Sequence, residues 1–317
     1  MSPESQTRRA TPEPDTSAAH ASTPTKPGKA PPRIAVLAAG RLRRFLLRSA
    51  DWMLPTHLSV LEHSHSFVHA RVLSTMVELG IPDHLASGPM TAEELASAVG
   101  CDPSALHRLL RAAAVFDVVR LDRTGRFHPT RSTRVLESGH TSGAAAWCRY
   151  IASASHQAAW TDLTESVRTG DSAFGRVHGV SMFDWFATHP DEGHNFSAGL
   201  GGLTLAEAPA IVASYPWPHE GSVCDAAGGA GVLLAEILKA RPQLHGILVG
   251  SDAVLDQARP YLAAQGVAQR SELHKGDLLA ALDVHADVYI LKWVLHDWDD
   301  DACERILGSI VATSTAR

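Results

Sequence analysis

The sequence predicts an α/β protein, with an open and mostly parallel sheet that follows an all-helical region of winged-helix type. From residue 216 onward, short apolar runs alternate with helical segments, which is typical of a parallel sheet. Between residues 67 and 129, three helical segments precede a hairpin pattern. We expect four regions: a disordered tail (1–32), a winged-helix-like region (33–140), a helical linker that contributes to a pocket (141–215) and the sheet (216–317).

The first 32 residues are rich in Pro, Thr, Ser, Ala and charged side chains. They hold few large apolar residues, so burial cannot offset the entropy of ordering, and we expect disorder. Segment 33–50 is amphipathic and basic. It fits a helix at a membrane surface or on a partner. It also fits a lead-in helix that packs on its own domain or on a second subunit, which is the interpretation we favour.

The winged-helix pattern begins with apolar residues at helical spacing from residue 67, which stop at Gly80 ahead of Pro82. Thr91 and Glu94 predict a capping box at the start of a second helix. A third helix follows Asp102, and a hairpin is expected around residues 123–125. The sequence therefore predicts three helices and a wing.

Winged helices bind DNA in many proteins, but this one offers few polar side chains that could contact bases. The third helix presents His107, Arg108 and Arg111, within a chain of net charge −6. A dimerisation module or a lid over a substrate has the same pattern. We favour these over nucleic-acid binding.

Composition narrows the class of protein further. The 317 residues are 45% hydrophobic, which suits a globular core. No apolar run approaches the 18–20 residues, roughly, that cross a bilayer, and no secretory signal is recognised. We expect no membrane association and a cytoplasmic location. Scattered cysteines without a CxxC pair predict buried thiols in a reducing compartment: Cys101, Cys148, Cys224 and Cys303.

The segment VCDAAGGAG, residues 223–231, lies between an apolar strand and a helical run. Gly228, Gly229 and Gly231 allow the backbone to approach a ligand closely, and the order strand, glycine turn, helix is typical of a nucleotide-type site. A dehydrogenase needs an acid at the end of the second strand. Gly250 stands there and Asp252 follows two residues later, which disfavours a nicotinamide cofactor.

His296 follows the last predicted strand, in LKWVLHDWDD. A histidine at this edge of the sheet can remove a proton from an acidic hydroxyl. Alternatively it caps the next helix, with Asp297, Asp299 and Asp300 as acids of the first turn. No second histidine stands at ligand spacing, so we expect no metal.

Three motifs together resemble one family. They are DAAGGAG at 225–231, KGD at 275–277 and LKWVLHDWDDDAC at 291–303. On them the chain resembles the S-adenosylmethionine-dependent O-methyltransferases of small aromatic molecules, of the plant phenylpropanoid and bacterial aromatic polyketide type. The resemblance covers roughly residues 60–317 and includes the segment 167–190. It implies a Rossmann-like class I methyltransferase sheet, a winged-helix dimerisation domain and a homodimer.

The resemblance also implies roles. His296 would act as general base on a hydroxyl of a small aromatic substrate, beside the cofactor S-adenosylmethionine. The turn at 227–231 would meet the methionine part, Asp277 and Leu278 would flank the adenine, and Lys292 would lie near the carboxylate or ribose. The implied cofactor residues are Asp225, Ala227, Gly229, Gly231, Asp252, Asp277, Leu278 and Lys292. A flat apolar substrate pocket is expected at Trp160, Phe174, Met182 and Phe183.

The chain departs from the family at several positions. Ala227 replaces a glycine and is tolerable only if its φ stays negative. Ala230 replaces a threonine, and Gly250 stands where the family has a ribose-binding acid, a role that Asp252 could take. The chain ends at Arg317, where the family continues with a strand pair and an acid that orients the base, so we expect a C-terminal truncation. These departures keep open a relative with hydroxylase or decarboxylase chemistry, a winged-helix regulator and a non-catalytic protein that binds a small aromatic.

Overall fold

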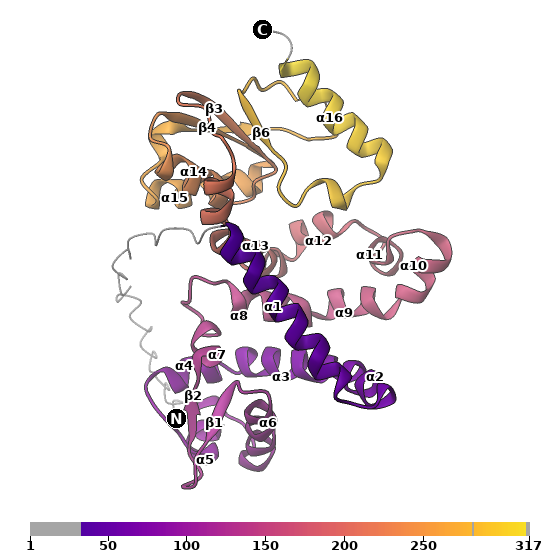
Figure 1. The fold of residues 1–317 in the computed structure, drawn as a ribbon, viewed down its shortest axis with the longest axis vertical. Helices are drawn as coiled ribbons and strands as arrows, with labels where there is room; N and C mark the ends of the chain where they lie inside the picture. The colour runs from indigo at the N-terminus through magenta and orange to yellow at the C-terminus, as the bar shows by residue number, and fades with distance from the viewer. Residues whose placement is uncertain (1–32, 281, 315–317) are drawn as a thin grey trace, which may run out of the picture.

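The computed structural model describes residues 33–280 and 282–314, so the expected disorder of residues 1–32 falls outside it. The chain is a mixed α/β protein. A helical N-terminal half and a C-terminal parallel sheet are joined by the long helix α13, Pro190–Ser214 (Figure 1). This is the predicted fold class.

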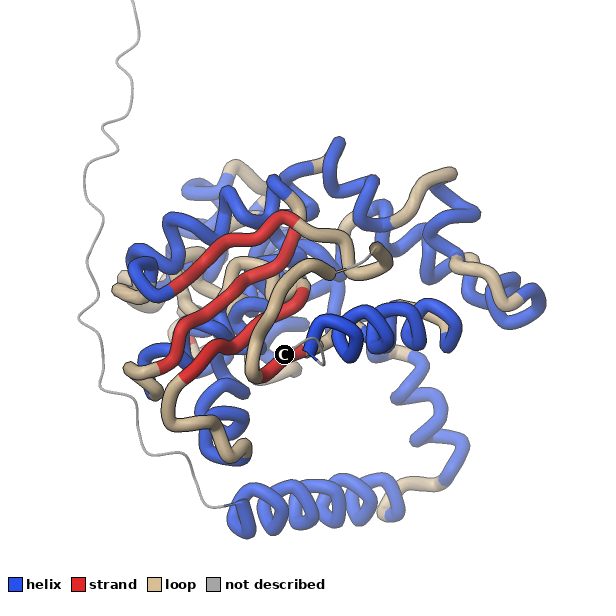
Figure 2. The backbone as a smooth tube through the Cα atoms, turned by 90° about the horizontal axis from the view of Figure 1, so that it is seen from above, coloured by secondary structure: helices blue, strands red, loops and turns tan. Residues whose placement is uncertain are grey.

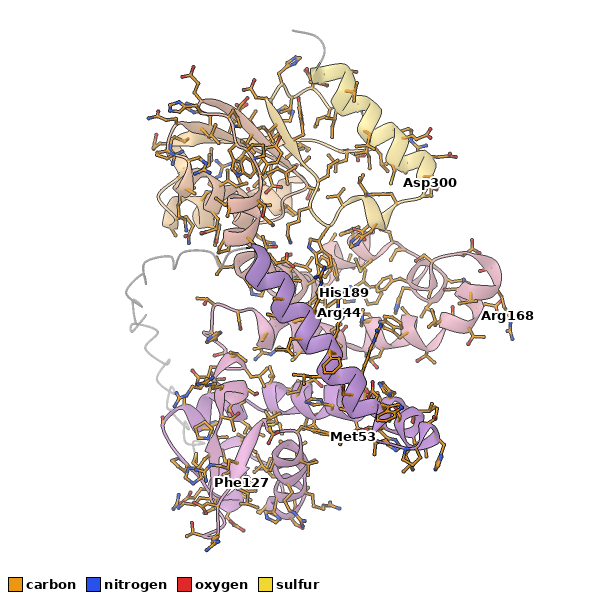
Figure 3. All side chains as sticks on the ribbon, in the orientation of Figure 1. Arg44, Met53, Phe127, Arg168, His189 and Asp300 are labelled. Carbon is orange, nitrogen blue, oxygen red and sulfur yellow. The ribbon has the colours of Figure 1, made fainter. Side chains whose placement is uncertain are left out.

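Two helices open the described chain, α1 (Arg33–Trp52) and α2 (Thr56–Ser64). Figure 2 shows that α1 stands apart from the rest of the molecule. Many of its large apolar side chains are exposed, as are those at the junction with α2, where Figure 3 labels Met53. The exposed set includes Leu42, Phe45, Leu46, Leu47, Trp52, Met53, Leu54, Leu58 and Leu61.

The winged-helix part has its own core, with Met76, Leu95, Leu110 and Phe127 fully buried. Its hairpin pairs β1 with β2 antiparallel, Leu121 opposite Phe127. The elements are α3 (Ser66–Glu78), α4 (Ile81–Ala86), α5 (Ala92–Val99), α6 (Pro103–Val115), β1 (Val119–Leu121), β2 (Phe127–Pro129) and α7 (Arg131–Val135).

The helix boundaries in this part follow the predicted signals. Gly80 has a φ of +67° between α3 and α4. The Thr91 side chain accepts from the N–H of Glu94, whose carboxylate accepts from the N–H of Thr91, so the capping box is confirmed. The Asp102 carboxylate accepts from the N–H of Ala105 and caps α6.

Short helices fill residues 144–188 and lead into α13. They are α8 (Ala144–Ala152), α9 (Ala154–Thr161), α10 (Leu163–Thr169), α11 (Ala173–His178) and α12 (Met182–Thr188). Helix α13 packs against α8 on one side and α14 on the other. A Cβ at Gly199 would lie 2.8 Å from the Trp147 ring, and one at Gly202 would lie 1.9 Å from the Ser142 carbonyl oxygen. These glycines let α13 and α8 approach closely.

Within the described ranges, α13 is the one helix long and apolar enough to cross a bilayer by length and composition. This corrects the expectation that no run approaches that length. Helix α13 contacts α8 and α14, yet only 17% of its apolar window is buried inside the described chain.

The described sheet is parallel, with strand order β5-β4-β3-β6. Figure 2 shows its strands side by side. Val223 packs into a core with α14 and α15, while its neighbour Cys224 faces a second core with Val249 and Leu282. The elements are β3 (Gly221–Ala226), α14 (Val232–Ala240), β4 (Leu244–Gly250), α15 (Asp252–Ala264), a 3-10 turn (Ala268–Arg270), β5 (Ser271–Lys275), β6 (Val288–Ile290), a second 3-10 turn (Leu295–Asp297) and α16 (Asp300–Ser314).

The four cysteines are free thiols, as predicted, but their burial differs from the prediction. Cys224 is buried in β3, whereas Cys101, Cys148 and Cys303 are only half-buried. Cys101 lies in the loop after α5, Cys148 in the middle of α8 and Cys303 in the first turn of α16.

Candidate active site

The carboxyl ends of neighbouring parallel strands carry the predicted site residues. The turn 227–231 follows β3, and the segment with Lys292 and His296 follows β6, which pairs directly with β3. Asp252 and Asp277 come just after the ends of β4 and β5. Because parallel strands end at one edge, the fold brings these residues to the same side of the sheet, where α/β proteins bind ligands.

The turn after β3 has a left-handed backbone at Ala227, with φ +62°, and at Gly229 and Gly231, with φ +57° and +77°. The condition of a negative φ, under which an alanine is tolerable at this position, is therefore not met. The N–H of Ala227 donates to the carbonyl of Val249 at 3.0 Å, which ties the turn to β4. An alanine in this region costs about 1–2 kcal/mol, because its Cβ crowds the following carbonyl.

Asp225 ends β3 under this turn and is 1% exposed. Its Oδ2 has no hydrogen-bond partner among the described residues. Burial raises the pKa of the carboxyl to about 7, against the lowering effects of a bond from the Leu234 N–H and of the charge on Lys292. The Leu234 N–H lies in the first turn of α14, so the carboxylate joins β3 to the helix that follows.

The edge fits the methionine part of S-adenosylmethionine. A Cβ built on Gly229 would meet no atom within 4 Å, so the turn borders open space. The unpartnered oxygen of Asp225 suits an ammonium group, and the N–H groups at the start of α14 suit a carboxylate.

Strand β4 ends without an acidic residue that could bind the ribose. Gly250 ends β4, and a Cβ there would lie 3.3 Å from Val254. Asp252 opens α15, where its carboxylate pairs with Lys275 at 2.5 Å, and both side chains are well exposed. Asp277 accepts from the Leu279 N–H at 2.9 Å. Leu278 packs against the core that includes Leu282.

Lys292 connects this edge to α13. Its Nζ donates to the Thr204 hydroxyl at 3.0 Å and pairs with the Glu207 carboxylate at 3.1 Å. The lysine side chain is 16% exposed and the glutamate side chain 39%, so the ammonium is largely withdrawn from water while the carboxylate keeps contact with it. The next residue, Trp293, has a φ of +58°. Ala227 and Trp293 thus place strained backbone after two adjacent strands, and such strain clusters at functional sites.

His296 lies in the 3-10 turn after β6 with its side chain 56% exposed. Its Nε2 is 3.3 Å from Asp297 Oδ1, and its ring meets Trp293 edge-on at 5.4 Å. Burial raises the pKa of Asp297, and the neighbouring imidazole opposes the shift. Asp299 caps α16 by accepting from the Ala302 N–H at 2.8 Å, so the alternative in which His296 is the helix cap is wrong.

Three of the four expected pocket residues contact the aromatic cluster around Tyr150: Met182 directly, Trp160 through His156, and Phe183 through Phe186 and Phe196. Trp160 and Phe183 are exposed, and Phe174 packs beside His178 and Trp185. Met182 accepts from the hydroxyl of Tyr150 at 3.3 Å. The Tyr150 ring packs against Phe186 at 6.1 Å and Phe196 at 5.1 Å, and none of these three stands among the four expected pocket residues.

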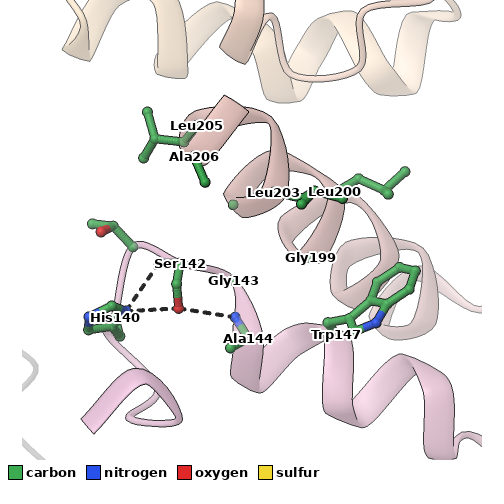
Figure 4. A pocket seen from close by; sticks show the side chains of 12 residues that line it. His140, Ser142, Gly143, Ala144, Trp147, Gly199, Leu200, Leu203, Leu205 and Ala206 are labelled. Atoms are coloured by element: carbon green, nitrogen blue, oxygen red, sulfur yellow. Dashed lines mark hydrogen bonds between the residues drawn. The ribbon is translucent and has the colours of Figure 1, made fainter. Parts of the chain in front are cut away.

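A separate cavity of about 450 Å³ lies between α8 and α13. Figure 4 shows Trp147 and His140 on one side and Leu200, Leu203 and Ala206 on the other. The Nδ1 of His140 is 2.8 Å from the Ser142 hydroxyl. None of the four residues expected at the substrate pocket lines this cavity.

Comparison with known proteins identifies two segments. Residues 160–316 match the family model of the O-methyltransferase domain, and residues 61–138 match the O-methyltransferase dimerisation domain. The mitomycin biosynthesis 6-O-methyltransferase of Streptomyces lavendulae is 38% identical over 76% of this chain and 69% of its own length. The 8-amino-8-demethylriboflavin N,N-dimethyltransferase of Streptomyces davaonensis is 36% identical over 76% of this chain and 70% of its own length.

Solved structures agree in fold. The mitomycin 7-O-methyltransferase MmcR superposes with a TM-score of 0.76 at 34% identity, covering 86% of this chain and 79% of its own. NcsB1, an O-methyltransferase from neocarzinostatin biosynthesis, was solved with S-adenosylmethionine and 2-hydroxy-5-methyl naphthoic acid. It superposes with a TM-score of 0.66 at 27% identity, covering 77% of this chain and 76% of its own. The chain therefore belongs to the O-methyltransferase family whose methyl donor is S-adenosylmethionine and whose N-terminal part is a dimerisation domain.

Proposed function

We propose that this chain methylates a hydroxyl group of an aromatic natural product, with His296 as general base and a homodimer as the working form. One observation supports this most: β3 and β6 are paired and parallel, so the glycine turn and the segment with His296 leave the sheet at one edge. The relatives add support, since their names include methyltransferases of mitomycin and of a dihydroxynaphthoate.

S-adenosylmethionine supplies an electrophilic methyl group when it is bound. The residues of the chain bind and orient the reactants and accept the proton. A phenol of pKa about 10 is a weak nucleophile until it loses its proton, and His296, exposed at the edge, accepts that proton at a ring nitrogen. Asp297, beside the ring, holds the imidazole in orientation and stabilises it once protonated. Holding the two reactants in line provides much of the acceleration.

The cofactor contacts follow from the edge. Asp225 and the turn residues Ala227, Gly229 and Gly231 would hold the methionine part, and Lys292 would face its carboxylate. Asp277 and Leu278 would flank the adenine. Asp252 would replace the missing ribose acid, since it stands two residues after Gly250 and only an exposed lysine competes for it. A weaker ribose contact would cost about 1–3 kcal/mol of affinity.

The organisation of the chain follows the same proposal. Residues 33–140 would form the dimerisation region, 141–215 the substrate-pocket region and 216–317 the cofactor-binding region. Trp160, Phe174, Met182 and Phe183 would contribute to the walls of the pocket. We place the enzyme in the cytoplasm, in keeping with its four free thiols.

Three measurements test the proposal. Isothermal titration with S-adenosylmethionine should show binding, and absence of binding at millimolar cofactor would refute a working methyltransferase. Product mass then identifies the chemistry, because methyl transfer adds one CH₂ whereas hydroxylation adds one oxygen. His296→Gln should lower kcat by about 10²–10⁴ and leave cofactor affinity unchanged. A variant with undiminished kcat would remove the base from the mechanism.

A further inference from the structure

A polar group lies inside the aromatic cluster of the helical region. Tyr150, on α8, is 4% exposed. Its ring packs against His156 at 4.6 Å, Phe196 at 5.1 Å and Phe186 at 6.1 Å. These neighbours come from α9, α12 and α13. The tyrosine thus stands where four helices converge.

The Tyr150 hydroxyl keeps much of its hydrogen-bonding capacity. It donates to Met182 Sδ at 3.3 Å. A thioether sulfur is a weak acceptor, and a hydroxyl oxygen also has two lone pairs. Buried polar atoms normally find strong partners. A hydroxyl buried against sulfur is therefore a group that a ligand can engage without breaking a strong bond.

Glu192 supplies a carboxylate to the same cluster from the first turn of α13. It accepts from the hydroxyl of Ser155. Burial raises the pKa of Tyr150 to about 12, with further contributions from the charges of Glu192 and Asp297. Burial lowers the pKa of His156, and Glu192 opposes that shift. Ser155, which bonds Glu192, directly precedes His156, whose ring packs on Tyr150, so the Glu192 carboxylate belongs to this cluster.

The Glu192 carboxylate has more hydrogen-bond acceptor sites than its partner Ser155 occupies. An ionised carboxylate offers about four acceptor sites, and Ser155 occupies one. His156 Nε2 accepts from the Trp160 ring N–H at 2.8 Å, so its proton lies on Nδ1 in the neutral ring. The cluster thus presents two oxygen acceptors, the Tyr150 hydroxyl and the Glu192 carboxylate, among aromatic side chains.

We propose that Tyr150 and Glu192 form the selective end of the substrate pocket, and that they favour aromatic acceptors with a second hydrogen-bond donor, a hydroxyl or amino group away from the methylated hydroxyl. The inference rests on the proposed function, because it assumes that the methylated hydroxyl of the substrate lies at His296. A pocket that bonds a substrate donor rejects the analogue that lacks it, because its own buried polar groups are then left unpaired.

The test uses two naphthols that differ in one donor. Titration of 2,7-dihydroxynaphthalene and of 2-naphthol, with S-adenosylhomocysteine present, gives a ratio of dissociation constants for each protein. We expect the wild type to bind the diol at least tenfold more tightly. Tyr150→Phe and Glu192→Gln should each reduce the ratio below threefold while 2-naphthol binds as before. Glu165→Gln, a matched change at an exposed pair with Arg168, should keep the full ratio.

A ratio near one in the wild type overturns the inference, as does a wild-type protein that binds neither naphthol. A ratio that persists in both variants also overturns it. Tyr150→Phe keeps the ring, so it decides the matter even where loss of the Ser155 bond unfolds the Glu192 variant. Failure of the proposed function has a different signature: the cofactor does not bind or no methyl group is transferred, while the naphthol ratio and its loss in the variants remain.

Discussion

Gly228 lies directly over the carboxylate of Asp225, because a Cβ at position 228 would come within 2.3 Å of Asp225 Cγ. The carboxylate is buried and tied to α14, so it has little room to move. Gly228→Ala should therefore destabilise the fold by about 1–3 kcal/mol and weaken cofactor binding. Urea unfolding and titration with S-adenosylmethionine measure the two effects. Gly308→Ala, in α16 with nothing within 4 Å, should be neutral or slightly stabilising; equal losses in both variants would contradict the close contact.

Ala227→Gly should relieve the left-handed backbone at this position. The strain of about 1–2 kcal/mol is partly offset by the greater freedom of glycine in the unfolded chain, about 0.4–1 kcal/mol. We expect a gain in stability between about 0 and 1.6 kcal/mol, which the urea midpoint reports. Ala210→Gly, at an exposed position of α13, should instead cost about 1 kcal/mol. A loss at position 227 as large as at 210 would argue against a positive φ at Ala227.

The buried carboxyl of Asp225 should make stability depend on pH. Its pKa is raised from 3.8 to about 7 by burial, so between these values the folded state holds a proton that the unfolded state releases. Stability from this group therefore falls as pH rises, by about 1.4 kcal/mol per unit, and levels off above pH 7. Asp225→Asn should gain relative to the wild type over the same range. A stability difference that stays flat from pH 4 to 7 would show that the carboxyl ionises normally.

The pair between Lys292 and Glu207 should matter more than a surface pair. Glu207→Gln removes the charge partner of a largely buried ammonium and should cost about 1–3 kcal/mol of stability. Glu165→Gln removes the partner of an exposed arginine and should cost less than about 1 kcal/mol. Thermal unfolding of both variants at equal concentration gives the comparison. Equal small losses would mean that Lys292 remains hydrated.

The exposed apolar face of α1 and α2 should be covered in a dimer. Light scattering after gel filtration should give twice the chain mass. The double change Phe45→Asp and Leu46→Asp introduces charge on that face and should shift the protein toward monomer. Arg43→Asp with Arg44→Asp alters charge on the same helix without removing apolar area. Dissociation by both pairs of changes would point to charge, not apolar burial, as the cause.

The fold was predictable because its signals are local. Thr91, Asp102 and Gly80 mark helix ends through their own side chains or backbone, and the structure has the ends where these residues predict them. The alternation of strands and helices after residue 216 likewise follows from short apolar runs. The length of α13 was less evident, since its glycines and Pro209 resemble loop residues until their packing against α8 is known.

The site was predictable where it depends on chain order. Strand, turn and helix around Asp225, and the position of His296 after a strand, are sequence features. The sign of φ at Ala227 was not, because the Val249 carbonyl that binds its N–H belongs to another strand. The aromatic cluster was not predictable either. Tyr150 and Phe196 are far apart in sequence and meet only when α8 packs on α13.

Pro209 has a consequence for the cavity between α8 and α13. Proline lacks an N–H, so the carbonyl of the residue four positions earlier, Leu205, is without its usual helical donor. Leu205 lines the cavity, whose walls are otherwise mostly apolar. The missing ladder bond gives α13 a place to bend between its α8 end and the sheet.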